Sequence, residues 1–103
     1  MYLIIKTCSN DIEILENISK IILKNKLSPC VHIIKNVKSK YIWKNNLTED
    51  LEHTIEIKTS NKFESQICNI IKENHNYDTP EIISFCTQIL DKEYEKWFNQ
   101  CIK

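Results

Sequence analysis

The sequence contains no glycine, no alanine and no arginine. Walker loops, dinucleotide-binding fingerprints and the nucleophile elbow of serine hydrolases all need glycine, because the backbone there turns sharply or approaches a ligand closely. Without arginine the chain also lacks the two-pronged guanidinium that recognises guanine and phosphate. These absences exclude the nucleotide-dependent enzymes and the serine hydrolases that carry such motifs.

Neither sign of charge is in excess, since 14 lysines balance 14 acidic residues. A protein that binds nucleic acid through its backbone phosphates usually carries a clear positive excess, so we expect no nucleic-acid partner. No apolar run approaches the roughly 20 residues that span a bilayer. No basic segment followed by a long apolar stretch marks a signal peptide. We therefore expect no membrane contact.

Five cysteines are present, but none forms a C-x-x-C pair, which excludes zinc-finger and thioredoxin motifs. The odd number and the lack of a signal peptide favour a reducing compartment. We interpret most of these thiols as small, buried hydrophobic groups.

What the sequence does have is a strong bias, because Ile, Lys and Asn make up 44 of its 103 residues. These residues have AT-rich codons, so we interpret the bias as a property of the genome. The length fits one domain over residues 1–103, with a modest core.

Hydrophobic periodicity and capping residues predict an α+β chain with the element order βαββαβ and a final helix. This is the order of the ferredoxin-like fold, with two helices on one face of an antiparallel sheet. The expected elements are a strand over Tyr2–Thr7, a helix that follows the cap cluster Ser9-Asn10-Asp11 and ends at a left-handed cap near Asn25, a strand over Val31–Ile34 that continues past an irregularity at Lys35-Asn36 to Trp43, a strand over Glu49–Thr59, a helix from Ser60-Asn61 to near Asn74-His75, a strand over Glu81–Thr87 and a helix from Asp91.

The second and third strands should form a long hairpin around Lys44-Asn45-Asn46. Alternation in the third strand predicts one apolar face and one polar face. The apolar face holds Leu51, His53, Ile55 and Ile57, and the polar face holds Glu52, Thr54, Glu56 and Lys58. This hairpin overhangs the shorter strands, and its unpaired edges favour sheet-edge pairing with another copy.

Several segments, in order along nearly the whole chain, resemble the CutA family of divalent-cation tolerance proteins. The resemblance implies a ferredoxin-like homotrimer in the cytoplasm and a role in tolerance of copper and other divalent metals. The segments are Leu27-Ser-Pro-Cys30-Val31, Ser39-Lys-Tyr41-Ile-Trp43, Glu52 with Ile57-Lys58-Thr59, His75-Asn-Tyr77-Asp-Thr-Pro80-Glu81-Ile82 and Tyr94-Glu-Lys-Trp97.

The chain departs from the family pattern where relatives use glycine. The family usually has Pro-Gly at Lys35-Asn36 and Trp-x-Gly at Trp43-Lys44-Asn45. Asparagine is the next-best residue at positive φ. We therefore predict positive φ at one or more of Asn36, Asn45 and Asn46.

The proposed copper ligands of bacterial members, a Cys and a His pair, match Thr7, Asn74 and His75 here. Only His75 keeps a ligand side chain, and the adjacent Cys8 lies on the opposite strand face. Cys8 and His75 are thus the candidate ligands for copper or another divalent cation. The alternative is that Cys8 packs in the core and His75 forms a hydrogen bond at the helix end.

A second group of residues is a candidate inter-subunit cleft, which would bind a small ligand or metal, or form a structural ion-pair network that fixes the register of the trimer. Its members are Tyr41, Trp43, Glu52, Lys58, Tyr77, Glu81 and Trp97. The aromatic members are also compatible with a core or interface role. No catalytic motif stands out, so we expect no enzyme. The functions that remain are a metal-responsive protein and a non-enzymatic small-ligand or signalling scaffold like the P-II trimers.

Overall fold

The computed structural model describes residues 1–103 and contains the elements that periodicity predicts, in the predicted order. None of its helices is long and apolar enough to cross a bilayer. The elements are β1 (Tyr2–Ser9), α1 (Ile12–Lys24), β2 (Cys30–Trp43), β3 (Asn46–Ser60), a 3-10 turn η1 (Asn61–Phe63), α2 (Glu64–Asn74), β4 (Ile83–Thr87) and α3 (Lys92–Cys101).

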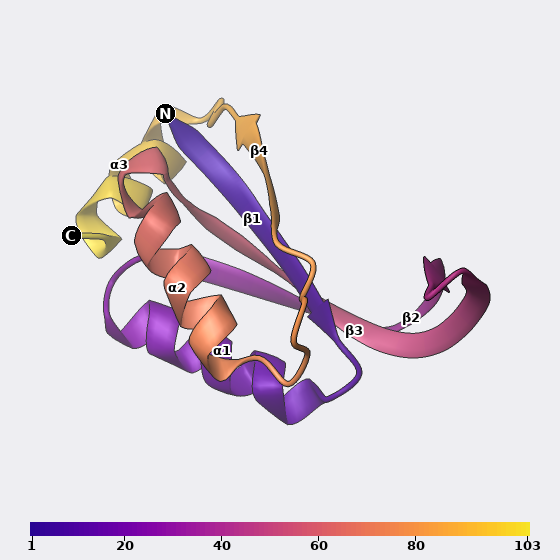
Figure 1. Ribbon diagram of the computed structural model, residues 1–103. Coiled ribbons are helices and arrows are strands. Elements are labelled where there is room, and N and C mark those ends of the chain that lie inside the picture. Colours follow the sequence, from indigo (N-terminus) through magenta and orange to yellow (C-terminus); the bar gives the residue numbers. More distant parts are fainter.

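The four strands form one antiparallel sheet in the order β2-β3-β1-β4. Helices α1 and α2 lie side by side on one face of it, and α3 lies near the N-terminal end of β1 (Figure 1). This arrangement confirms the ferredoxin-like fold with an added C-terminal helix. The face of the sheet opposite α1 and α2 is left open.

The core lies between the sheet and the two helices. Alternate strand residues such as Ile5, Ile55 and Ile57 are fully buried and meet helix residues at three- and four-residue spacing. Within the expected cap cluster Asp11 caps α1, and Asp91 caps α3; their side chains accept hydrogen bonds from the backbone N–H groups of Glu13 and Tyr94.

The left-handed residue after α1 is Lys26, one residue later than the expected Asn25. Asn25 has φ of −86°, and its side-chain amide donates to the carbonyl of Ile21. Lys26 instead takes the positive φ, 57°. The N–H groups of Lys26 and Leu27 then bond the carbonyls of Leu23 and Ile22, which is a Schellman motif. The turn at Lys26 leaves the side chain of Leu27 fully buried in the core.

Two asparagines occupy the positions where the resemblance led us to expect glycine. Asn36 has φ of 62° in a bulge where it and Lys35 together oppose His53. Its N–H donates to Nδ1 of His53 at 3.1 Å. Asn45 has φ of 64° and Lys44 has φ of 49°, a pair of values typical of a type I′ hairpin turn. The prediction of positive φ is thus confirmed at Asn36 and Asn45, whereas Asn46 already belongs to β3.

The division of β3 into one apolar and one polar face holds, but beyond the bulge the burial of the two faces is reversed. Leu51 is 55% exposed, whereas Glu52 is only 6% exposed. The helices cover the sheet only near Ile55 and Ile57, and the hairpin then curves away from them (Figure 1). In the distal half, the covered face is the polar one.

Two smaller expectations also need correction. Strand β4 begins at Ile83, so Glu81 lies in the loop before it. The cysteines are not buried: Cys86 is exposed, and the other four are partly exposed, with all five thiols free. Their positions on strand and helix surfaces that α1 and α2 do not cover explain this difference.

Thr7 and Thr59 are both fully buried under the helices, but only one of their hydroxyls has a partner. Thr59 Oγ1 donates to the carbonyl of Leu27 at 2.6 Å, whereas Thr7 Oγ1 has no hydrogen-bond partner. We expect Thr7→Val to raise the free energy of unfolding by about 1 kcal/mol, because it removes an unsatisfied buried hydroxyl without changing the side-chain shape. Urea unfolding at fixed protein concentration measures this.

Thr59→Val is the matched control, because the same change here leaves the Leu27 carbonyl unpaired. It should lower the free energy of unfolding by about 1–2 kcal/mol. Equal destabilisation by the two variants would show that Thr7 has a hydrogen-bond partner after all.

Candidate functional site

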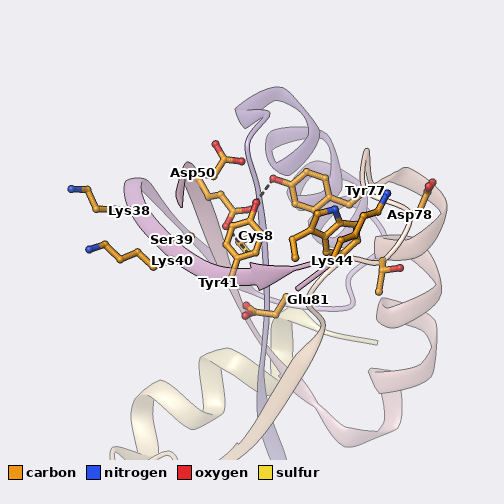
Figure 2. A pocket seen from close by; sticks show the side chains of 13 residues that line it. Cys8, Lys38, Ser39, Lys40, Tyr41, Lys44, Asp50, Tyr77, Asp78 and Glu81 are labelled. Atoms are coloured by element: carbon orange, nitrogen blue, oxygen red, sulfur yellow. Dashed lines mark hydrogen bonds between the residues drawn. The ribbon is translucent and has the colours of Figure 1, made fainter. Parts of the chain in front are cut away.

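The open face of the sheet carries a groove of about 920 Å³. It lies where the end of β1, the distal hairpin and the loop between α2 and β4 meet (Figure 2). The bend at the Asn36 bulge and the short β4 leave this end of the sheet uncovered. The lining residues are Cys8, Lys38, Ser39, Lys40, Tyr41, Trp43, Lys44, Asp50, Glu52, Tyr77, Asp78, Thr79 and Glu81.

The groove brings together most of the residues that the sequence singled out for a cleft. Five of the seven line it, namely Tyr41, Trp43, Glu52, Tyr77 and Glu81, and the candidate ligand Cys8 joins them. Lys58 and Trp97 lie apart from the groove. The Lys58 ammonium donates to the Tyr94 hydroxyl at 3.4 Å, and the Trp97 ring packs against Tyr94. One chain alone therefore forms only part of the predicted cleft.

Glu52 is the most enclosed acidic group of the groove. The Tyr77 hydroxyl donates to its Oε2 at 2.7 Å, and the Cys8 thiol lies 3.9 Å from its Oε1. No cation pairs with it, since the chain's one ion pair joins Lys40 to Glu49 at 3.8 Å on the exposed surface. As a residue Glu52 is only 6% exposed, and its carboxylate has only neutral partners, which is costly for a charged group unless a cation binds beside it.

Cys8 faces the groove because successive residues of β1 alternate between the two faces of the sheet. Thr7 points into the core, and Cys8 points to the open face beside Glu52. Burial, followed by the negative charges of Glu81 and Glu52, raises the pKa of the Cys8 thiol to about 12. The thiol is therefore protonated at neutral pH and is neither a ready nucleophile nor a ready metal ligand.

His75 lies behind the groove wall and is held by the backbone. Its Nδ1 accepts a hydrogen bond from the N–H of Tyr77 at 3.0 Å, so its proton must lie on Nε2. Nε2 then donates to the carbonyl of Cys8 at 2.8 Å. Burial lowers the pKa of His75, although the Cys8 carbonyl and Glu52 oppose this shift.

These contacts bear on whether the residues fit a metal ion. Both ring nitrogens of His75 are engaged, and the ring contacts the carbonyl of Cys8 rather than its thiol. No three Cys, His, Asp or Glu side chains lie close enough to enclose a metal. The chain does not hold a preformed Cys8–His75 chelate, and metal binding by these two residues stays a prediction.

No sequence pattern indicates the contacts that hold the loop before β4. Tyr77 OH accepts from the N–H of Asn10 at 2.8 Å, Ser9 Oγ donates to Asn76 at 2.6 Å, and the Asn76 amide donates to Asn10 at 2.9 Å. These residues are 66 or 67 positions apart, beyond the reach of local patterns. The acidic lining residue Asp50, by contrast, could have been found, since it shares the strand face of Glu52.

The geometry of His75 predicts a specific dependence of stability on pH. The unfolded chain takes up a proton near the ordinary pKa of 6.5, but burial disfavours the charged ring in the folded chain, and a protonated Nδ1 cannot accept from Tyr77. This contribution is complete above about pH 6.5 and is lost as the pH falls through the lowered pKa of the folded state. Denaturant unfolding from pH 8 to pH 5 measures it.

His75→Gln is the control, because glutamine offers a donor and an acceptor but does not titrate. Its stability should fall less than that of the parent protein below pH 6.5, with His32 and His53 unchanged in both. Parallel curves for the two proteins would contradict the assigned role of His75.

Comparison with known proteins places this arrangement in a family. The family model described as CutA1 divalent ion tolerance protein matches residues 2–101. The protein CutA homolog of Xenopus laevis is 31% identical over 96 residues, which cover 93% of this chain but only 63% of the relative's length. The chain thus spans less than two thirds of that relative.

Solved structures agree with the sequence comparison. CutA1 from Ehrlichia chaffeensis superposes with a TM-score of 0.89 at 32% identity, covering 97% of this chain and 94% of the other. The CutA of Archaeoglobus fulgidus, described as periplasmic, has a TM-score of 0.93 at 26% identity, with both chains fully covered. With a family match over almost its whole length and the same fold, the chain belongs to the CutA1 divalent ion tolerance family.

Proposed function

We propose that the chain, as one CutA-like domain, assembles into a cytoplasmic homotrimer through its sheet edges. β4 and the distal part of β2 are edge strands that expose apolar side chains. Ile83 and Phe85 on β4 are about half exposed, and Ile42 and Leu47 at the hairpin tip are 73% and 84% exposed. Unpaired edges with large apolar groups favour association of further strands.

We further propose that each subunit contributes to divalent-cation tolerance by reversibly binding a small cationic ligand in the groove. The observation that carries this proposal is Glu52, a buried carboxylate at the groove with no cation beside it. Binding of a cation would remove the cost of this unpaired charge. Any structural register role of the same carboxylate would require a cation from a neighbouring copy.

The groove supports binding rather than catalysis. The thiol of Cys8 is protonated, and the imidazole of His75 is directed to a backbone carbonyl, so they form no thiol–imidazole pair. We therefore propose a non-enzymatic role. A signalling function like that of the P-II trimers rests on fold-level analogy alone.

Metal binding is a second candidate, favoured by the position of Cys8 between Glu52 and Glu81. A soft cation such as copper would use the Cys8 sulfur, and His75 would join it only after giving up its bond to the Cys8 carbonyl. Because the thiol must lose its proton, the affinity would be weak and would increase with pH.

The trimer is tested by light scattering of the purified protein at micromolar concentration. We expect a mass three times that of the 12.3 kDa chain. Phe85→Asp, on the edge strand β4, should shift the protein towards the monomer, because it places a charge on the apolar edge. A mass of one chain for the parent protein would refute the assembly.

Copper binding is tested by calorimetry on the reduced protein, with Cys8→Ser and His75→Gln as variants. The second candidate predicts saturable binding that strengthens from pH 6 to pH 8 and weakens at least tenfold in Cys8→Ser. Cys86→Ser, which changes an exposed thiol outside the groove, is the control. If copper binding is the same in Cys8→Ser and the parent protein, the groove is not the metal site.

A further inference from the structure

The charges of the groove are unevenly paired. Three lysines line it, namely Lys38, Lys40 and Lys44, but none forms an ion pair with a groove carboxylate. Figure 2 shows the Lys38 and Lys40 side chains directed away from Cys8 and Tyr77. Burial and then the charges of Asp50 and Glu52 raise the pKa of Tyr41, a sign of negative potential at this place. No lysine therefore forms an ion pair with Glu52 or Asp50, although Lys6 lies near enough to Cys8 to oppose the rise of its pKa.

The lining also discriminates between kinds of cation. A bare metal ion needs several short contacts to ligand atoms, and no three acidic, Cys or His side chains provide them. The groove instead presents the rings of Tyr41, Trp43 and Tyr77 beside its carboxylates. Aromatic faces attract organic ammonium groups and pack against their alkyl chains.

Asp50 brings a second carboxylate to the groove, and its Oδ1 accepts a hydrogen bond from the N–H of Leu51 at 2.8 Å. Asp50 is two residues earlier on the same face of β3, so the two Cα atoms are about 7 Å apart. Both residues line the groove, with Glu52 buried and Asp50 partly exposed. Two ammonium groups joined by a chain of about four carbons span such a separation.

From this geometry we propose that the groove binds a linear aliphatic diamine or polyamine. One ammonium group donates to the free lone pairs of the Glu52 carboxylate, the second lies at Asp50, and the alkyl chain packs against Tyr41. This inference rests on the proposed cation-binding function and specifies its ligand class.

The test is calorimetric titration of the full-length, reduced protein with 1,4-diaminobutane at low ionic strength. Two probes separate shape from charge: 1,4-butanediol has the same length without charge, and Mg²⁺ has the same charge without the chain. We expect saturable binding of the diamine alone. Glu52→Gln should weaken it at least tenfold, because the variant removes a buried charge partner.

Glu49→Gln is the matched control, since it removes the same charge from the same strand outside the groove. It should change the affinity less than twofold. Asp50→Asn and Tyr41→Leu should each weaken binding several-fold, which keeps the test valid if Glu52→Gln fails to fold.

The other outcomes separate this inference from the function on which it rests. Saturable binding of Cu²⁺ or Mg²⁺ that Glu52→Gln abolishes, with no binding of the diamine, would overturn the polyamine and keep the cation-binding groove. Diamine binding that is equal in Glu52→Gln, Asp50→Asn and the parent protein would also overturn the inference. Absence of binding by every cation would overturn both proposals.

Discussion

The carboxylate of Glu52 is the group around which the distal half of the molecule is arranged. The Tyr77 hydroxyl donates to it and also accepts from the N–H of Asn10, so one hydrogen-bonded chain joins β3, the end of β1 and the loop before β4. His75 completes the connection by donating to the Cys8 carbonyl. No helix covers this face. These polar contacts therefore hold its strands and loop together, as apolar packing does under α1 and α2.

The position of Glu52 follows from the bend of the hairpin. Lys35 and Asn36 oppose His53 alone, and the left-handed conformation of Asn36 turns the strand pair away from the helix layer. Beyond this bulge Leu51 becomes exposed and Glu52 becomes covered. A bulge without glycine thus separates an apolar core from a polar groove within the same two strands.

Local patterns were enough to predict the elements and their order. Alternating Ile5, Ile55 and Ile57 and the caps Asp11 and Asp91 act over a few residues, so sequence reveals them directly. The exposure of Leu51 and the burial of Glu52 were not predicted, because strand alternation indicates which residues share a face but not which face is covered. Lys58 lies six positions from Glu52 along β3, so one chain keeps them apart, and their meeting in an inter-subunit cleft stays a prediction.

Whether a ligand cation pairs with Glu52 is decided by a crystal structure of the assembled protein grown with 1,4-diaminobutane. We expect an amine nitrogen within hydrogen-bond distance of the Glu52 carboxylate, with the alkyl chain against Tyr41. A lysine ammonium of a neighbouring copy at that carboxylate would contradict this expectation, because Glu52 would then be a structural ion-pair partner.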